Sequence, residues 1–389
     1  MNKILLYINI FLLQSYLFRF QILGFPTHLQ EVLIIILSFS FLIESIRKKS
    51  WPKIPKTPLI FLILSITASL VVQIFDTQYF LRYWRFLIFA SILTGLFINI
   101  LDTEEKQKEG LKILSLGTLF FAIFSLIVNI IGINNASDLR LLGPLDSAVY
   151  LGFYLAPFFI YNFTILVQKR TKKQIILTIS LGIFLLLTKS IGAILGSAIV
   201  STLFLFKKYN KELLNSIIKK TIFALLIIMT ISAVYITKIK PTIETKWSSL
   251  DERQQSYITS NYLLNQDKSI ILLGIGPNQF QYHYEQNVLV AINNKPLDYT
   301  VLQPHNIFYF TIFNYGIIGF LFLILLTFKI VKNLITLKSD SFQFQVSLIV
   351  LYFILHGLID TPFLKNDLLI LIILFIELSL FTKSSKQLS

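Results

Sequence analysis

The chain of 389 residues contains no cysteine. This absence excludes disulfide bonds, thiolate metal sites and a cysteine nucleophile. Charged residues are also scarce, at 14% of the chain, whereas hydrophobic residues make up 55% and the mean hydropathy is +0.71. A soluble domain typically carries about 25% charged residues. The shortage of charge therefore excludes an ordinary soluble fold and indicates a polytopic membrane protein.

Histidine and acidic residues are few as well. The four histidines show no recognisable ligand spacing, so we expect no metal site and no cofactor. The 20 acidic residues are outnumbered by 35 basic ones, which gives a net charge of +15. Most basic residues fall in short loops between apolar runs, as in cytoplasmic membrane loops. The sequence therefore predicts contact with membrane lipid and no nucleic-acid partner.

Apolar runs long enough to cross a membrane predict an all-α fold with twelve transmembrane helices. Their expected positions are 4–24, 29–46, 58–75, 80–100, 111–133, 147–167, 174–188, 191–206, 221–237, 305–328, 342–360 and 366–382. Spans seven and eight come from one run, which we expect to break at Thr188-Lys189-Ser190 because it is too long for one helix. Residues 1–389 are predicted to form a single integral membrane domain, whose first span is a retained helix and not a signal peptide.

The distribution of basic residues predicts the orientation. With both termini in the cytoplasm, the inner segments hold 22 basic residues, whereas the short outer loops hold only Arg140, Lys189 and Lys365. Segment 238–304 then becomes one large extracytoplasmic loop. Within it, a capping box at Ser249 predicts a helix over about 250–265. Pro277 favours the start of a second helix, over about 277–291.

His305 is the first candidate for chemistry, because it follows Pro304 where the tenth span begins at the outer surface. A helix N-terminus disfavours a charged imidazolium, and a neutral histidine can accept a proton from a hydroxyl. The alternative is an interfacial histidine that only caps the helix.

Arginines near the outer membrane surface are the second candidates. Arg82 and Arg85 lie one turn apart near the outer end of the fourth span. An arginine at membrane depth costs on the order of 3 kcal/mol, so it usually faces a partner or a polar cavity. The partner is Asp76 in one interpretation and a phosphate group in the other. Arg140 and Arg253 could join the same cationic cluster.

His356 and Asp360 form a third candidate, near the outer end of the eleventh span. Their spacing of four residues predicts a shared helix face. An ionisable pair inside a membrane indicates a functional site, although a hydrogen bond between helices would explain it equally well.

The stretch His305-Asn306, nine residues, Gly316, two residues, Gly319 resembles the signature of the O-antigen ligase family, which includes O-antigen polymerases. The turn 272–280, the Arg253 segment, residues 140–143 and residues 356–362 are similar to other parts of that family. The layout of twelve spans with a large outer loop after the ninth is also similar.

The resemblance implies a GT-C-type membrane glycosyltransferase in the bacterial cytoplasmic (inner) membrane, involved in lipopolysaccharide or other surface polysaccharide synthesis. Such an enzyme moves a glycan from an undecaprenyl-diphosphate carrier to a sugar hydroxyl of a glycan or lipid A core acceptor, without a metal. The resemblance also implies that His305 is the catalytic base. The implied donor-diphosphate ligands are Arg82, Arg85, Arg140, Arg253 and Lys189, with Asn306, His356 and Asp360 in support.

Three alternatives stay open. A polymerase would use the same carrier, cations and base. A transporter of lipid-linked sugar would need a polar path across the whole bilayer, whereas the embedded charges here lie at the outer ends of the spans. An inactive relative is the third, because the family often has Ser-Arg-Gly where this chain has Ser190-Ile191-Gly192. Lys189 could replace the missing charge but not its bidentate geometry.

Overall fold

A computed structural model describes residues 1–14, 18–22, 25–132, 140–145, 147–209, 248–292, 301, 303–361, 363 and 365–381. In this part of the chain, six helices are long and apolar enough to cross a membrane. They are α2 (Leu29–Arg47), α4 (Thr77–Ile100), α5 (Glu104–Ile131), α6 (Ala148–Gln168), α8 (Ile191–Tyr209) and α13 (Ile307–Thr336). The chain is therefore a predominantly helical, multi-pass membrane protein, whereas the number of twelve spans stays a prediction.

Shorter elements complete the described fold. The remaining helices are α1 (Asn2–Phe11), α3 (Lys56–Val71), α7 (Lys172–Leu187), α10 (Ser248–Gln266), α11 (Ser269–Leu273), α12 (Phe280–Ala291), α14 (Phe342–Gly357) and α15 (Asn366–Phe381). Helices occupy ten of the twelve predicted spans, and the ninth span, 221–237, lies outside the described residues. The break between spans seven and eight is confirmed, since Lys189 has a φ of 48° between α7 and α8.

The prediction of a first span over 4–24 is wrong. Helix α1 ends at Phe11, and two antiparallel strands follow, β1 (Arg19–Ile22) and β2 (Phe25–His28). A continuous helix would have carried Arg19 into the apolar span, at a cost of about 3 kcal/mol. A short helix followed by a hairpin avoids this penalty.

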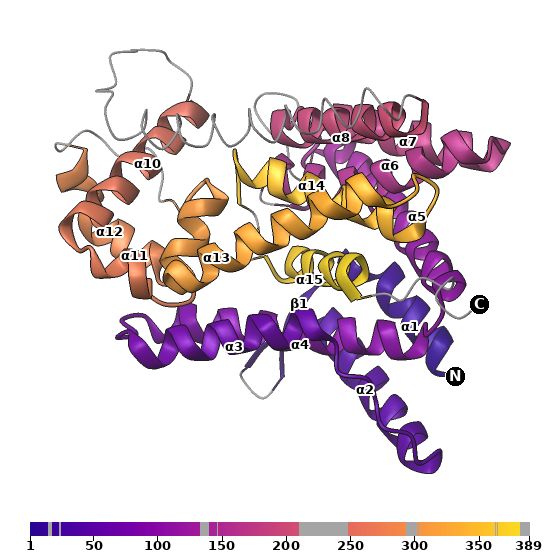
Figure 1. Ribbon diagram of the computed structural model, residues 1–389, viewed down its shortest axis with the longest axis horizontal. Helices are drawn as coiled ribbons and strands as arrows, with labels where there is room; N and C mark the ends of the chain where they lie inside the picture. The colour runs from indigo at the N-terminus through magenta and orange to yellow at the C-terminus, as the bar shows by residue number, and fades with distance from the viewer. Residues whose placement is uncertain are drawn as a thin grey trace.

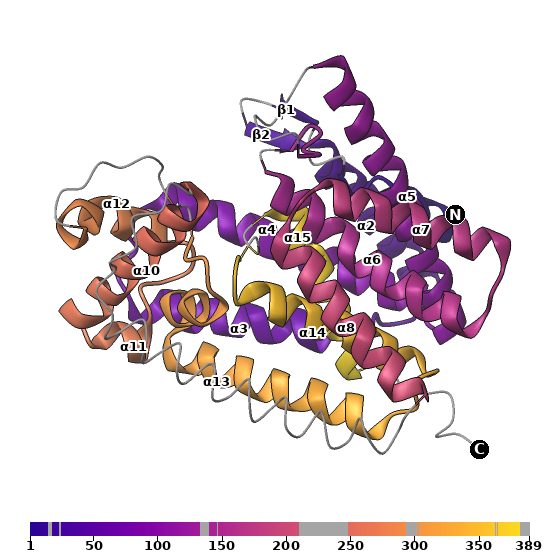
Figure 2. The same ribbon diagram turned by 90° about the horizontal axis from the view of Figure 1, so that it is seen from above.

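The helices α3, α4, α13, α14 and α15 run roughly along the long axis of the molecule (Figure 1). Helices α10, α11 and α12 gather at one end, whereas Met1 and the last turn of α15 lie toward the other (Figure 1). Seen from above, α13 runs along one side of the bundle, next to α3 and α14 (Figure 2). This arrangement puts the predicted extracytoplasmic helices at the opposite end from Met1.

Large apolar side chains cover much of the bundle's outer surface. Leu70, Ile130 and Phe328 are 80%, 75% and 69% exposed. In water such a surface would favour aggregation, but in a bilayer it contacts lipid tails. The outward apolar residues therefore agree with the hydropathy of the sequence.

A buried carboxylate joins the last helix to the third. Glu377 of α15 accepts hydrogen bonds from the backbone N–H groups of Lys56 (3.2 Å) and Thr57 (2.6 Å). The first N–H groups of a helix have no partner inside the helix, and its N-terminus favours a negative charge. Glu377 thus caps α3 from 320 residues away.

Helix α13 contains a break at Gly316, whose φ and ψ are 62° and −152°. The break leaves the Phe313 carbonyl free to accept a hydrogen bond from the backbone N–H of Ile275, at 2.7 Å. A Cβ on Gly316 would lie 2.2 Å from the carbonyl oxygen of Leu272, so only glycine fits. The end of α11 therefore packs directly against α13 at this position.

The turn that follows α11 makes a second contact, through Gln279, which is fully buried. Its Oε1 accepts the backbone N–H groups of Phe75 (3.0 Å) and Asp76 (2.8 Å), and its Nε2 donates to the Asp76 carbonyl (2.8 Å). Asn278 beside it donates through Nδ2 to the Tyr79 carbonyl, at 2.8 Å. The turn before α12 is therefore fixed to the connection between α3 and α4. The two helices predicted over about 250–265 and 277–291 are confirmed as α10 and α12.

Candidate functional site

His305 and Asp360, which are 55 residues apart in sequence, form a hydrogen-bonded pair. His305 Nδ1 lies 3.0 Å from Asp360 Oδ1. Both side chains are largely buried, at 19% and 12% exposed. His305 immediately precedes Asn306, the N-cap of α13, and Asp360 follows the end of α14, so two loop ends place the pair.

The geometry fixes how the imidazole is used. An ionised carboxylate can only accept a hydrogen bond, so His305 Nδ1 carries the proton and Nε2 is left as the acceptor. Nε2 is buried and has no hydrogen-bond partner among the described residues. A buried acceptor without a partner costs about 1–3 kcal/mol. Such an atom is suited to a proton from a bound hydroxyl.

Arg253 approaches the same carboxylate from α10. Its Nη2 lies 3.5 Å from Asp360 Oδ2, so the two oxygens of Asp360 face two different side chains. Burial alone would raise the pKa of Asp360, but the hydrogen bond from His305 and the nearby charges of His305, His356 and Arg253 lower it below its ordinary value. Asp360 therefore stays ionised at neutral pH, as the proposed tautomer of His305 requires.

Neighbouring groups hold the His305 backbone in place. The Tyr257 hydroxyl donates to the His305 carbonyl, at 3.0 Å, and the Thr361 hydroxyl donates to the Pro304 carbonyl. Burial raises the pKa of Tyr257 to about 12, so its hydroxyl keeps its proton. Sequence reasoning missed Tyr257, although its position four residues after Arg253 places both on one face of α10.

Asn306 has two separate roles in this part of the site. Its Oδ1 accepts the Phe308 N–H at 2.8 Å, which caps α13, and its Nδ2 donates to the Leu358 carbonyl at 3.2 Å. The second bond ties the start of α13 to the loop that carries Asp360. Asn306 therefore supports the His305–Asp360 pair structurally. It is one of the supporting residues that the sequence predicts.

Of the predicted arginines on α4, Arg85 has a clear protein partner. Its Nε donates to Glu31 Oε1 at 2.6 Å, and its Nη2 pairs with Glu31 Oε2. Glu31 is 2% exposed, so this bidentate contact uses two donors of Arg85 inside the protein. Arg82 is exposed and its guanidinium carbon lies 5.4 Å from the centre of the Phe86 ring. Asp76, the partner considered from the sequence, instead caps α4 by accepting the Tyr79 N–H, at 2.8 Å.

Two further predicted cations lie on connections that touch each other. The backbone N–H of Leu141, next to Arg140, donates to the carbonyl of Leu187, the last residue of α7, at 2.9 Å. Lys189 is exposed two residues further on. Arg140 and Lys189 are therefore carried by joined loops, and their role in binding a diphosphate stays a prediction.

His356 is more completely buried than Asp360, and its side chain contacts different residues. Helix α14 ends at Gly357, but the Asp360 N–H still donates to the His356 carbonyl at 3.0 Å, so the two residues lie one turn apart while their side chains have different hydrogen-bond partners. His356 Nδ1 instead lies 2.8 Å from the Tyr352 hydroxyl, and Phe153 packs edge-on against the imidazole ring. A Cβ on Gly192 would lie 3.5 Å from His356 Nε2, which places His356 beside the start of α8. Ile191, where the family often has arginine, is 64% exposed.

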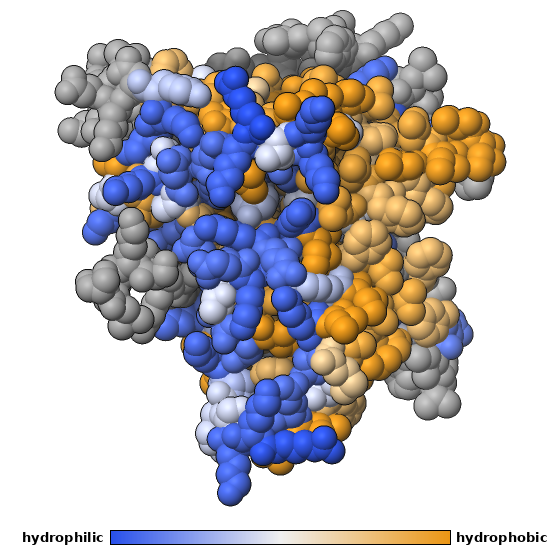
Figure 3. Space-filling view, turned by 90° about the vertical axis from the view of Figure 1, so that its right-hand side faces the viewer, coloured by the Kyte–Doolittle hydropathy of each residue, from blue (hydrophilic) through white to orange (hydrophobic). Residues whose placement is uncertain are grey.

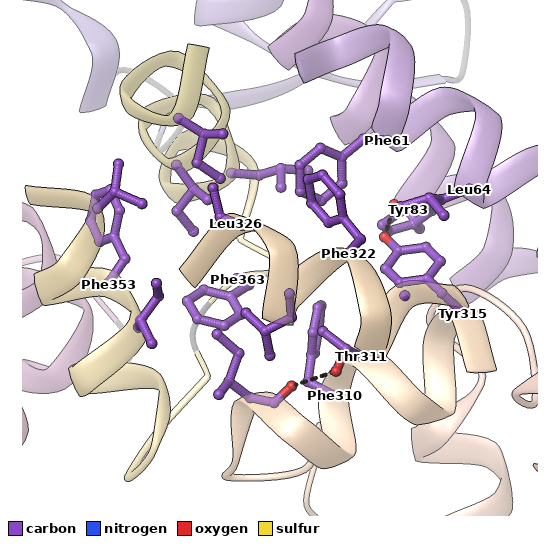
Figure 4. A pocket seen from close by; sticks show the side chains of 18 residues that line it. Phe61, Leu64, Tyr83, Phe310, Thr311, Tyr315, Phe322, Leu326, Phe353 and Phe363 are labelled. Carbon is purple, nitrogen blue, oxygen red and sulfur yellow. Dashed lines mark hydrogen bonds between the residues drawn. The ribbon is translucent and has the colours of Figure 1, made fainter. Parts of the chain in front are cut away.

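An apolar pocket of about 70 Å³ is lined in part by residues close in sequence to His305 and Asp360. Its wall includes Ile307, two residues after His305. It also includes Phe363, three residues after Asp360 (Figure 4). The pocket extends between α3, α4, α13, α14 and α15. Tyr83 and Tyr315 meet at one side of it, where their hydroxyls hydrogen-bond to each other (Figure 4). The pocket thus offers apolar volume lined by residues that follow His305 and Asp360 closely in the sequence.

The described residues contain no cluster of three or more side chains that could hold a metal ion. No protein family, curated protein or solved structure matches this chain. The site is therefore interpreted from its own geometry and from the resemblance of its sequence motifs.

Proposed function

We propose that this protein is a glycosyltransferase like the O-antigen ligases, which transfers a glycan from an undecaprenyl-diphosphate carrier to a sugar hydroxyl. The observation that carries the proposal is the His305–Asp360 pair, with the unpaired Nε2 of His305 opposite the carboxylate. A base held in one tautomer by a carboxylate is the arrangement that activates a hydroxyl nucleophile.

In the proposed reaction the acceptor hydroxyl oxygen attacks the anomeric carbon of the donor sugar. The new bond joins that oxygen to the carbon, and the bond between the carbon and the diphosphate oxygen breaks. The hydroxyl proton moves to Nε2 of His305, and the diphosphate leaves with the bonding electrons. Asp360 stabilises the imidazolium that results, and Arg253 supplies positive charge near the leaving group.

The surroundings of the pair support a lipid-linked donor. The apolar pocket beside Ile307 and Phe363 has room for part of a branched hydrocarbon chain, whereas Arg253 offers a cation next to Asp360. A substrate with an apolar tail and an anionic head would place its reacting bond between these two regions. The same features serve a polymerase equally, since only the acceptor differs.

The test is a transfer assay with purified protein and an undecaprenyl-diphosphate glycan, run with and without a lipid A core acceptor. Product that forms only with the core indicates a ligase, and longer carrier-linked chains without core indicate a polymerase. His305→Gln should lower the rate at least about 100-fold, because it removes the base. His283→Gln, on α12, is the matched control and should retain transfer.

The assay can also reject the proposal. Normal transfer by folded His305→Gln protein would exclude His305 as the base. Wild-type protein that moves the glycan across a vesicle membrane without forming a new glycosidic bond would be a transporter instead.

A further inference from the structure

A polar hollow of about 500 Å³ opens at the end of the molecule that carries Met1, far from the His305–Asp360 pair. It lies between the start of α1, the end of α2, the end of α4 and the connection from α2 to α3. Its wall includes Lys3 of α1, Lys48 and Lys53 of the connection from α2 to α3, and Lys106 of α5. Viewed onto this end, hydrophilic side chains cover the centre and left of the molecule and extend to its lower edge (Figure 3).

Acidic side chains balance most of these lysines. Salt bridges join Lys48 to Glu44, Lys106 to Asp102 at 2.7 Å and Lys3 to Glu109 at 2.9 Å. Lys53 is exposed and makes no salt bridge within the described part of the chain. The hollow therefore carries a small positive excess. Asp102 is close enough to Lys53 to interact with its charge, but Lys53 is the one of these lysines that forms no salt bridge with a described carboxylate.

The backbone around Lys53 is fixed on both sides. Asn99, near the end of α4, accepts the Lys53 N–H at 2.7 Å through Oδ1 and donates to the Lys53 carbonyl at 2.8 Å through Nδ2. Four residues later, Glu377 holds the backbone of Thr57. Lys53 is thus presented by an anchored connection, so binding an anion there would order little backbone.

Trp51, two residues before Lys53, also lines the hollow and is 96% exposed. Exposure of an indole ring to water is not favourable in free energy, whereas tryptophan side chains are enriched in the headgroup layer of a membrane. A fixed lysine, an exposed tryptophan and a polar hollow at the end of a helical bundle suit the headgroup of a membrane lipid.

We propose that this hollow binds the phosphate headgroup of an anionic phospholipid, with Lys53 as its principal cationic contact and Trp51 at the level of the headgroups. The bundle's apolar outer surface continues beside the hollow and would contact the acyl chains of the bound lipid. The site is separate from the glycosyl-transfer site, so it does not depend on that function.

The experiment measures lipid binding to the full chain in a neutral detergent by native mass spectrometry, with phosphatidylglycerol and phosphatidylcholine as probes. Phosphatidylglycerol should bind more tightly, and Lys53→Gln should weaken its binding about fivefold, which corresponds to ~1 kcal/mol for one lysine at a membrane surface. Lys172→Gln, at the start of α7, removes an exposed lysine outside the hollow and should change the affinity little.

Several results would overturn the proposal. Equal affinity for the two lipids would show that the anionic headgroup is not recognised. Equal effects of Lys53→Gln and Lys172→Gln would show that any surface charge suffices. Complete displacement of phosphatidylglycerol by millimolar inorganic phosphate would point to a soluble phosphate ligand in place of a lipid.

Discussion

At the scale of single residues, Asp360 links the parts of the candidate site. One oxygen faces His305 Nδ1 and also accepts the Thr361 N–H at 2.9 Å, and the other faces Arg253. Asp360 therefore contacts both the proposed base and an arginine from the outer helices. Asp360 is thus a positioning residue that acts on the reaction through His305.

Asp360→Asn tests this role, because it keeps the size of the side chain and removes its charge. The amide can donate to His305 Nδ1 and so favour the tautomer with the proton on Nε2, which cannot accept the hydroxyl proton. We expect the transfer rate to fall at least about 100-fold, with a smaller change in donor affinity. Steady-state kinetics with varied donor would separate the two effects.

Asp340→Asn is the matched control, since Asp340 is an exposed carboxylate at the other end of α13. It should leave transfer unchanged. If Asp360→Asn raised only the Michaelis constant for the donor, Asp360 would serve donor binding and not the orientation of His305.

Individual residues were predicted from the sequence with mixed results. His305, Asp360, Arg253 and Asn306 lie together, although the sequence could not show that Asp360 contacts His305 and not His356. The reason is that the contact joins two residues 55 positions apart, which no local pattern relates. The buried Glu31 that pairs with Arg85 was also missed, because it lies 54 residues earlier and no local pattern relates the two.

At the scale of elements, the turn between α11 and α12 attaches the outer helices to the bundle. Gln279→Ala would remove three hydrogen bonds made by a fully buried side chain and leave the backbone groups of Phe75 and Asp76 without these partners. We expect a loss of stability on the order of 2–4 kcal/mol, concentrated at this junction. Hydrogen exchange of the α12 amides should accelerate, whereas exchange in α6 should not.

Gln281→Ala provides the comparison within the same helix, because Gln281 makes a hydrogen bond to the exposed Glu285 at 2.8 Å. Its effect on exchange should be small. Equal effects of the two variants would mean that the turn is not the point of attachment.

The break in α13 makes a second prediction at this scale. Gly316→Ala forces a side chain into a positive φ and within 2.2 Å of the Leu272 carbonyl oxygen. Backbone strain alone should cost about 1–3 kcal/mol, seen as a lower thermal unfolding temperature in detergent. Gly95→Ala, in α4, should be tolerated, because its Cβ would meet only Pro55 at 3.7 Å. An unfolding temperature unchanged by Gly316→Ala would argue that α13 is continuous.

Elements were predicted more reliably than their contacts. Long apolar runs correctly predicted ten helices, because in lipid every backbone N–H and C=O group has to be hydrogen-bonded within the segment across the thickness of the bilayer. The hairpin over 19–28 and the break at Gly316 were not predicted, since both depend on what packs nearby. The signature glycines indicated that Gly316 is special but not that it meets a turn from the outer segment.

At the scale of the whole molecule, the predicted orientation can be measured directly, because the natural chain has no cysteine. Single cysteines at Gln266, at the end of α10, and at Lys172, at the start of α7, should report opposite sides of the membrane. A thiol reagent that cannot cross membranes should label Gln266→Cys on intact bacterial spheroplasts. Lys172→Cys should react only after permeabilisation.

The reverse labelling pattern would place His305 on the cytoplasmic side and contradict a reaction on the outer face. Labelling of both positions before permeabilisation would contradict the assignment of the basic loops to the cytoplasm.

The cap on α3 has a consequence for how the chain is made. Ribosomes add about 5–20 residues per second, so roughly 16 to 64 s separate the synthesis of Thr57 from that of Glu377. During that time the first turn of α3 has to find other partners for its N–H groups, in water or in the insertion machinery. The third helix can therefore reach its final state only after the last one has been synthesised, so a nascent chain that stops before Glu377 leaves its N-terminal half unfinished.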